Sequence, residues 1–159
     1  MPPTTASDAK PAVVRLHPVR SLVLASDAAY CERALAVIGD LGPVLLAMTA
    51  VHGCGDPADV LVLVRHENPD VLVLDATGCE EGVERLIPVL AAELPRVGVV
   101  VVCEHSTTAA QRLGALPKWG WTQDLRRAVE RAYDDRGRRM ARRRPAAGPR
   151  AAGPLAGWD

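Results

Sequence analysis

Residues 68–75 constrain the fold more than any other stretch of this sequence. Their centre is a run of four apolar residues, 71–74, and the pair Pro69 and Asp70, typical of a turn, precedes it. A short apolar run after a turn predicts a strand buried on both faces, as is usual for a central strand of a parallel sheet. The run ends on Asp75. Ligands of open parallel sheets bind beyond the carboxyl ends of the strands, so this carboxylate lies where a site is expected, unless it only caps the next segment.

The rest of the chain alternates between short apolar runs and segments with helical spacing. The apolar runs predict strands over residues 21–25, 44–51 and 97–103, and a brief fifth strand within 114–120. Helical spacing predicts helices after residue 27, over 57–67, from 77 to about 90, over 107–113 and from 122. This alternation predicts an α/β fold, a three-layer α/β/α sandwich around a five-stranded parallel sheet.

Three local signals concern the ends and continuity of helices. Asp56 and Pro57 suit the N-cap and the first position of a helix. Thr77 and Glu80 have the spacing of a capping box, which predicts that Thr77 caps the following helix. Pro88 predicts a kink or a restart within that helix.

The 159 residues predict one domain flanked by two tails. We expect a flexible segment over residues 1–19, a folded domain over 20–135 and a disordered, Arg-, Ala-, Gly- and Pro-rich tail over 136–159. The first 135 residues carry a net charge of −6 and the remainder +6, so an acidic domain precedes a basic tail. The sequence shows neither a signal peptide nor an apolar run of membrane-spanning length, and we expect a cytoplasmic protein without membrane contact.

Several classes of function lack their usual sequence signatures. Cys31, Cys54, Cys79 and Cys103 are widely spaced, which favours small buried side chains over disulfides. No glycine-rich phosphate loop follows a strand, so nucleotide binding has no support. No pair of nucleophile and base is visible, and we therefore expect that the protein is not an enzyme.

The order of the elements and several motifs together resemble the receiver domain of bacterial two-component response regulators. The similarity covers roughly residues 20–134, and it implies a flavodoxin-like topology. Pro69 and Asp75 bound a segment like the third strand of receivers, which ends on the phosphoacceptor aspartate. The other matching positions are Ser26 and Asp27 (two adjacent acids in receivers), Gly82, Cys103 (Thr or Ser in receivers), Gly114, Ala115, Lys118 and residues 122–125.

The resemblance implies phosphoryl transfer to a carboxylate. Asp75 would be the nucleophile and would form an acyl phosphate. Asp27, Asp75 and the backbone carbonyl near Thr77 would hold Mg²⁺. Lys118 would hold a phosphate oxygen, and Cys103 stands where a hydroxyl normally binds another. Each of these residues also has a purely structural interpretation. Asp27 and Thr77 would be helix caps, Lys118 would be a surface lysine and Cys103 would be a core residue.

The chain departs from the receiver pattern at several points. Ser26 removes one acid from the metal pocket, and Cys103 offers only a weak S–H donor. The segment between Cys103 and Lys118 is short, which removes much of the fourth helix. We therefore expect an atypical receiver with a weakened Mg²⁺ site. One alternative is a degenerate receiver, which keeps the fold but has lost the phosphorylation switch.

The predicted function is a stand-alone atypical receiver that serves as a phosphorelay signalling or protein-interaction module. Its expected partners are a histidine kinase or another signalling protein, with a homodimer through the last strand and helix as a further option. One alternative is a conventional phospho-accepting single-domain response regulator. Another is a nucleic-acid-associated transcriptional regulator, because the arginines from Arg136 to Arg144 would make weak contacts with phosphate backbones.

Overall fold

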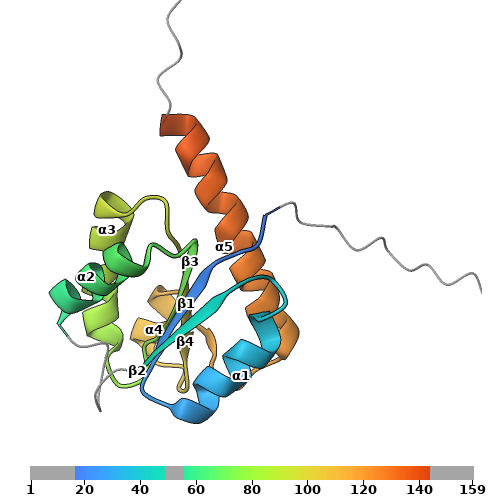
Figure 1. The fold of residues 1–159 in the computed structure, drawn as a ribbon. Helices are drawn as coiled ribbons and strands as arrows, with labels where there is room; N and C mark the ends of the chain where they lie inside the picture. Colours follow the sequence, from blue (N-terminus) through green and yellow to red (C-terminus); the bar gives the residue numbers. More distant parts are fainter. Residues whose placement is uncertain (1–16, 49–55, 144–159) are drawn as a thin grey trace, which may run out of the picture.

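The computed structural model describes residues 17–48 and 56–143, which form three layers (Figure 1). Strands and helices alternate along the chain, as the sequence predicts. The elements are β1 (Ser21–Ala25), α1 (Ala28–Ile38), β2 (Val44–Met48), α2 (Pro57–Glu67), β3 (Val71–Asp75), α3 (Glu80–Glu93), β4 (Gly98–Cys103), α4 (Thr108–Arg112), β5 (Leu116–Pro117) and α5 (Thr122–Arg143).

The central layer is a five-stranded sheet in the order β2-β1-β3-β4-β5. All four pairs of neighbouring strands are parallel, which confirms the predicted fold class. Every residue of β1 and β3 is buried. Successive side chains of a strand point to opposite faces, so an unbroken apolar run places one set of residues in each of two cores.

Helices cover both faces of the sheet, with α1 and α5 on one face and α2 and α3 on the other (Figure 1). Val23 and Val73 face α1 and α5, and they pack in one core with Tyr30 and Val129. The alternate strand residues face α2 and α3 in a second core, which contains Leu22, Leu24, Leu72, Leu74, Val60, Val64, Val83, Leu86 and Leu90. Because aromatic residues are scarce, Val, Leu and Ala form most of both cores.

The sequence signals for helix ends prove correct in one place and wrong in another. Asp56 accepts a hydrogen bond from the backbone N–H of Ala58, and Pro57 is the first residue of α2, which confirms the predicted start. The predicted capping box is wrong, because Cys79 precedes α3 and the Thr77 hydroxyl binds Asp75 instead. Pro88 lies on the exposed side within the continuous helix α3.

The last helix is longer than the sequence predicts. It continues to Arg143, so residues 136–143 are helical where disorder was expected. Arg136, the first residue of this extension, contacts the folded body: its guanidinium pairs with Asp70 at 2.6 Å and lies over the ring of Tyr133 at 4.5 Å. These contacts fasten α5 to the start of β3. The tail expectations for residues 1–16 and 144–159 lie outside the described residues.

No helix in the described part of the chain combines the length and the apolar character that are needed to cross a membrane.

Candidate functional site

Three residues that the sequence singled out meet at the carboxyl edge of the sheet. Asp27 follows β1, Asp75 ends β3 and Lys118 follows β5. The Lys118 Nζ atom lies 2.8 Å from Asp75 Oδ2 and 3.5 Å from Asp27 Oδ2. The two carboxylates therefore share one ammonium group, although 48 and 43 residues of chain separate Asp75 from its two partners.

Asp75 is almost fully enclosed, with 2% of its side chain exposed. Its Oδ1 atom accepts hydrogen bonds from the backbone N–H of Thr77 at 3.0 Å and from the Thr77 hydroxyl at 2.6 Å. The same hydroxyl accepts a hydrogen bond from the backbone N–H of Glu104 at 3.1 Å. Each carboxylate oxygen has two lone pairs, so Oδ1 is saturated, while Oδ2 bonds Lys118 with one lone pair and keeps the other.

Lys118 is also buried, with 3% of its side chain exposed. Its Nζ atom lies 5.4 Å from the centre of the Tyr30 ring and 5.5 Å from that of the Trp119 ring, within the range of cation–π attraction. Burial alone would lower the pKa of Lys118, but hydrogen bonds and charge from Asp75 and Asp27 outweigh it and raise the pKa above its usual value. The lysine is therefore a permanent cation at neutral pH.

Asp27 combines the two roles that the sequence left open. Its Oδ1 atom accepts hydrogen bonds from the backbone N–H groups of Ala29 and Tyr30, so it caps α1. Its Oδ2 atom faces Lys118. Burial works to raise the pKa of Asp27, but these two N–H groups and Lys118 together lower it below the usual value.

Cys103 and Glu80 form a contact that sequence reasoning missed. The buried Cys103 thiol donates a hydrogen bond to Glu80 Oε1 at 3.3 Å, and burial raises the pKa of this thiol. The Cys103 carbonyl accepts a hydrogen bond from the backbone N–H of Lys118 at 2.9 Å, which positions the lysine. Glu80 was interpreted as a capping partner of Thr77, and its spacing from Thr77 gave no hint of Cys103. Among the described cysteines there is no disulfide.

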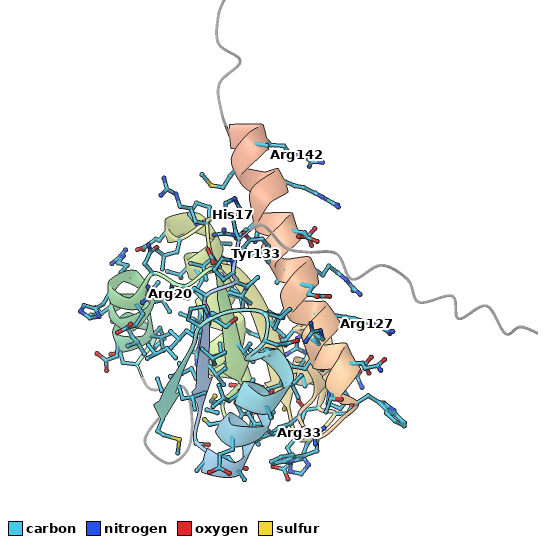
Figure 2. All side chains as sticks on the ribbon, turned by 45° about the vertical axis from the view of Figure 1, so that its right-hand side comes forward. His17, Arg20, Arg33, Arg127, Tyr133 and Arg142 are labelled. Carbon is cyan, nitrogen blue, oxygen red and sulfur yellow. The ribbon has the colours of Figure 1, made fainter. Side chains whose placement is uncertain are left out.

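A second group of residues that sequence analysis did not predict holds the loop between β5 and α5 in place. The Tyr30 and Trp119 rings meet edge to face, with centroids 5.7 Å apart. Arg33 of α1, labelled in Figure 2, lies over the Trp119 ring and donates a hydrogen bond to the Gly120 carbonyl. These contacts hold the loop that carries Lys118 against the start of α1.

Comparison with known proteins identifies the fold. No protein-family model and no curated protein sequence matches the chain. The signal receiver domain of an HD domain-containing protein from Pseudomonas fluorescens matches with a TM-score of 0.60 and 16% identity, over 82% of this chain and 98% of that one. The BeF3-activated receiver domain of DrrB gives 0.57 and 18%, over 74% and 99%. The chemotaxis response regulator CheY4 of Vibrio cholerae gives 0.54 and 12%, over 73% and 99%.

The chain has the receiver fold. At these identities the likeness concerns the fold alone.

The residues of the site fit Mg²⁺ in part. No group of three or more Asp, Glu, His or Cys side chains suited to a metal occurs within residues 17–48 and 56–143. Mg²⁺ commonly uses only one or two carboxylates and keeps several water ligands. Asp27 and Asp75 match it in number, but the Oδ2 atom of each faces Lys118 in this structure. The third predicted donor is the backbone carbonyl near Thr77, while the Thr77 hydroxyl is engaged with Asp75 and Glu104.

Proposed function

We propose that this protein is an atypical receiver that acts as a signalling or protein-interaction module, with Asp75 as its candidate phosphoacceptor. The observation that carries the proposal is the Lys118 ammonium, which contacts both Asp75 and Asp27 at the carboxyl edge of a receiver-fold sheet. A histidine kinase or another signalling protein is the proposed partner.

The geometry supports one route for the chemistry. The remaining lone pair of Asp75 Oδ2 would attack phosphorus, and the leaving group of the donor would depart with its bonding electrons. Lys118, whose Nζ atom lies 2.8 Å from Asp75 Oδ2, would donate a hydrogen bond to a phosphoryl oxygen and offset its negative charge. Asp27, Asp75 and the Thr77 carbonyl would hold Mg²⁺, which when bound neutralises negative charge on the phosphoryl group.

Two features argue that this reaction is inefficient. The Asp75 side chain is 2% exposed and its Oδ1 atom is saturated by Thr77, so a phosphodonor reaches Oδ2 only after the site opens. The Cys103 thiol is a weak donor, and it is already directed to Glu80. We therefore expect slow and incomplete phosphorylation, and signalling that depends more on docking than on the phosphoryl group.

Intact mass spectrometry after incubation with Mg²⁺ and acetyl phosphate tests the proposal. We expect a small fraction of the protein to gain about 80 Da, the mass of one phosphoryl group. Asp75→Asn should abolish this gain, while Asp124→Asn, at an exposed acid in the first turn of α5, should leave it unchanged. The double variant Ser26→Asp/Cys103→Thr should increase it, because it restores an acid and a hydroxyl.

The other outcomes are equally informative. Complete labelling of the unchanged protein would favour the conventional phospho-accepting alternative. Labelling that persists in Asp75→Asn would remove Asp75 from its proposed role. No labelling in either the unchanged protein or the double variant would mean that the site does not accept a phosphoryl group.

A further inference from the structure

One edge of β4 lacks a neighbouring strand over most of its length. The strand pairs with β3 from Gly98 to Val102, but with β5 only at Val102 and Cys103, since β5 has two residues. The N–H of Gly98 and the carbonyl of Val102 bond toward β3. Peptide groups alternate in direction along a strand, so those of Val99 and Val101 point to the opposite edge. The pairing of Leu116 with Val102 uses the Val101 carbonyl, while no described strand faces Val99 or the N–H of Val101.

A groove runs along this edge between α3 and α5. It consists of two adjoining hollows of about 520 Å³ and 300 Å³, which share Ile87, Val99, Ala132 and Asp135. We call it the β4 groove. Most of the side chains that line it are apolar, and they come mainly from α3, β4 and α5, with Leu113 and Leu116 closing one end. The short helix α4 and the two-residue strand β5 leave it uncovered within the described part of the chain.

The rim of the β4 groove is strongly basic. Arg131, Arg138, Arg139 and Arg142 of α5 line it, against the single acid Asp135. Arg142 lies on the part of α5 that extends beyond the body of the protein (Figure 2). The groove therefore combines an apolar lining, a partly open strand edge and an excess of positive charge.

We propose that the β4 groove binds an extended, acidic segment of a partner protein, which pairs with Val99 and the N–H of Val101 as an added strand. Alternate apolar side chains of that segment would cover Ile87 and Ala132, and its carboxylates would face the arginines. Strand addition at an exposed sheet edge uses main-chain hydrogen bonds for affinity and side-chain pockets for specificity. Charge complementarity supplies the preference for acids.

Other occupants fit less well. A second copy would bring two arginine rims together, and like charges repel. Neither terminal segment of this chain is acidic: residues 1–16 contain one Asp against one Lys and one Arg, and residues 144–159 contain one Asp against two Arg. A nucleic acid would satisfy the arginines but would leave the apolar lining and the strand edge unused.

This inference deepens the proposed function by naming the chemistry of a docking partner. It stands apart from the phosphorylation test, because the β4 groove lies toward the start of β4 while Asp75 lies opposite Val102 near its end. Failure of acetyl phosphate labelling would leave peptide binding unaffected, and Asp75→Asn should bind peptide like the unchanged protein.

Fluorescence anisotropy with the full chain tests the proposal. The probe is a fluorescein-labelled peptide of alternating Glu and Val, seven residues long. Two matched peptides carry Lys in place of each Glu, or Pro in place of the central Val, which cannot donate to a strand ladder. We expect the Glu peptide to bind, and both matched peptides to bind about tenfold more weakly or worse.

Variants and a second measurement locate the binding. Arg139→Glu/Arg142→Glu should weaken binding of the Glu peptide by about tenfold or more, because both residues line the groove. Arg127→Glu, on the same helix but pointing away from the body (Figure 2), should change it by less than about twofold after screening by salt. The backbone amide of Val99 should become protected from hydrogen exchange when the Glu peptide binds.

Three results would overturn the proposal: no binding of the Glu peptide at low salt, equal binding of the Pro peptide, or unchanged exchange at Val99. Binding of a single-stranded oligonucleotide that is lost in the Arg139→Glu/Arg142→Glu variant, with no peptide binding, would assign the surface to nucleic acid instead.

Discussion

Lys118 keeps two carboxylates together at the carboxyl edge of the sheet. Its ammonium group and Asp75 are both almost completely buried, and Asp27 is the third member of the cluster. Removing one member of a buried ion pair leaves an uncompensated charge, which costs far more than the pair itself contributes. At the residue scale the cluster therefore links the candidate chemistry to the stability of the fold.

Substitution of Lys118 tests this link. Lys118→Met should lower the free energy of unfolding by about 3–5 kcal/mol, because Asp75 loses its counter-charge. Urea unfolding followed by circular dichroism measures the change. The double variant Lys118→Met/Asp75→Asn should recover part of the loss, since it removes the buried charge. If the double variant is as unstable as the single one, the cost arises from packing against Tyr30 and Trp119 instead.

The lowered pKa of Asp27 predicts how the stability of the protein depends on pH. Its pKa in the folded protein lies below its usual value of 3.8. Its contribution to stability is therefore complete above pH 3.8 and is lost as the pH falls through the lower pKa of the folded state. In Asp27→Asn, which retains a capping side chain, the urea midpoint should fall less between about pH 5 and pH 2 than in the unchanged protein. An identical pH profile would contradict this assignment.

At the element scale, the position of α5 depends on one glycine. Gly98 begins β4, and a Cβ atom placed there would lie 2.6 Å from the carbonyl oxygen of Ala132. The backbone of α5 therefore approaches the sheet more closely than any other residue would allow. This close approach also sets one wall of the β4 groove.

Gly98→Ala should force α5 away from β4 and lower the free energy of unfolding by about 1–3 kcal/mol, the usual cost of overpacking. Gly82→Ala is the matched control. A Cβ atom at Gly82 meets no other atom within 4 Å, and the residue lies in α3. Alanine there should raise stability by up to about 1 kcal/mol, because it favours the helix. Equal effects of the two changes in thermal unfolding would show that α5 moves freely.

At the scale of the whole molecule, opposite charges join the two parts of the chain. The first 135 residues are acidic and the remainder is basic. Arg136 pairs with Asp70 and donates to the carbonyl of Arg96, so the start of the basic segment already belongs to the folded body. The boundary of the domain therefore lies beyond residue 135.

This boundary can be tested by two changes. Arg136→Ala should lower the free energy of unfolding by about 1–2 kcal/mol, the combined size of a partly exposed ion pair and a cation–π contact. Truncation after Arg143 should leave stability unchanged within about 0.5 kcal/mol, the usual range for exposed sites. Chemical denaturation of both proteins measures this, and a large loss on truncation would place further stabilising contacts after residue 143.

The success of prediction from the sequence varies with the range of the interaction. Alternation of apolar runs and helical segments indicated the parallel sheet, and Asp56 with Pro57 marked a helix start, because both signals are local. The prediction for Thr77 was wrong, because its hydroxyl binds Asp75 and not the end of α3. The Glu80 contact with Cys103 joins residues 23 positions apart, and no local pattern encodes it.

The sequence by itself determined the alternation of strands and helices and the placement of Asp75 at the end of a buried strand, because period, turns and caps act over a few residues. Only the tertiary structure decided that Asp75 is enclosed by Thr77 and Lys118, that α5 continues to Arg143, and that β4 keeps an open edge. These features depend on how distant segments pack, and packing selects among contacts that the local sequence leaves equally available.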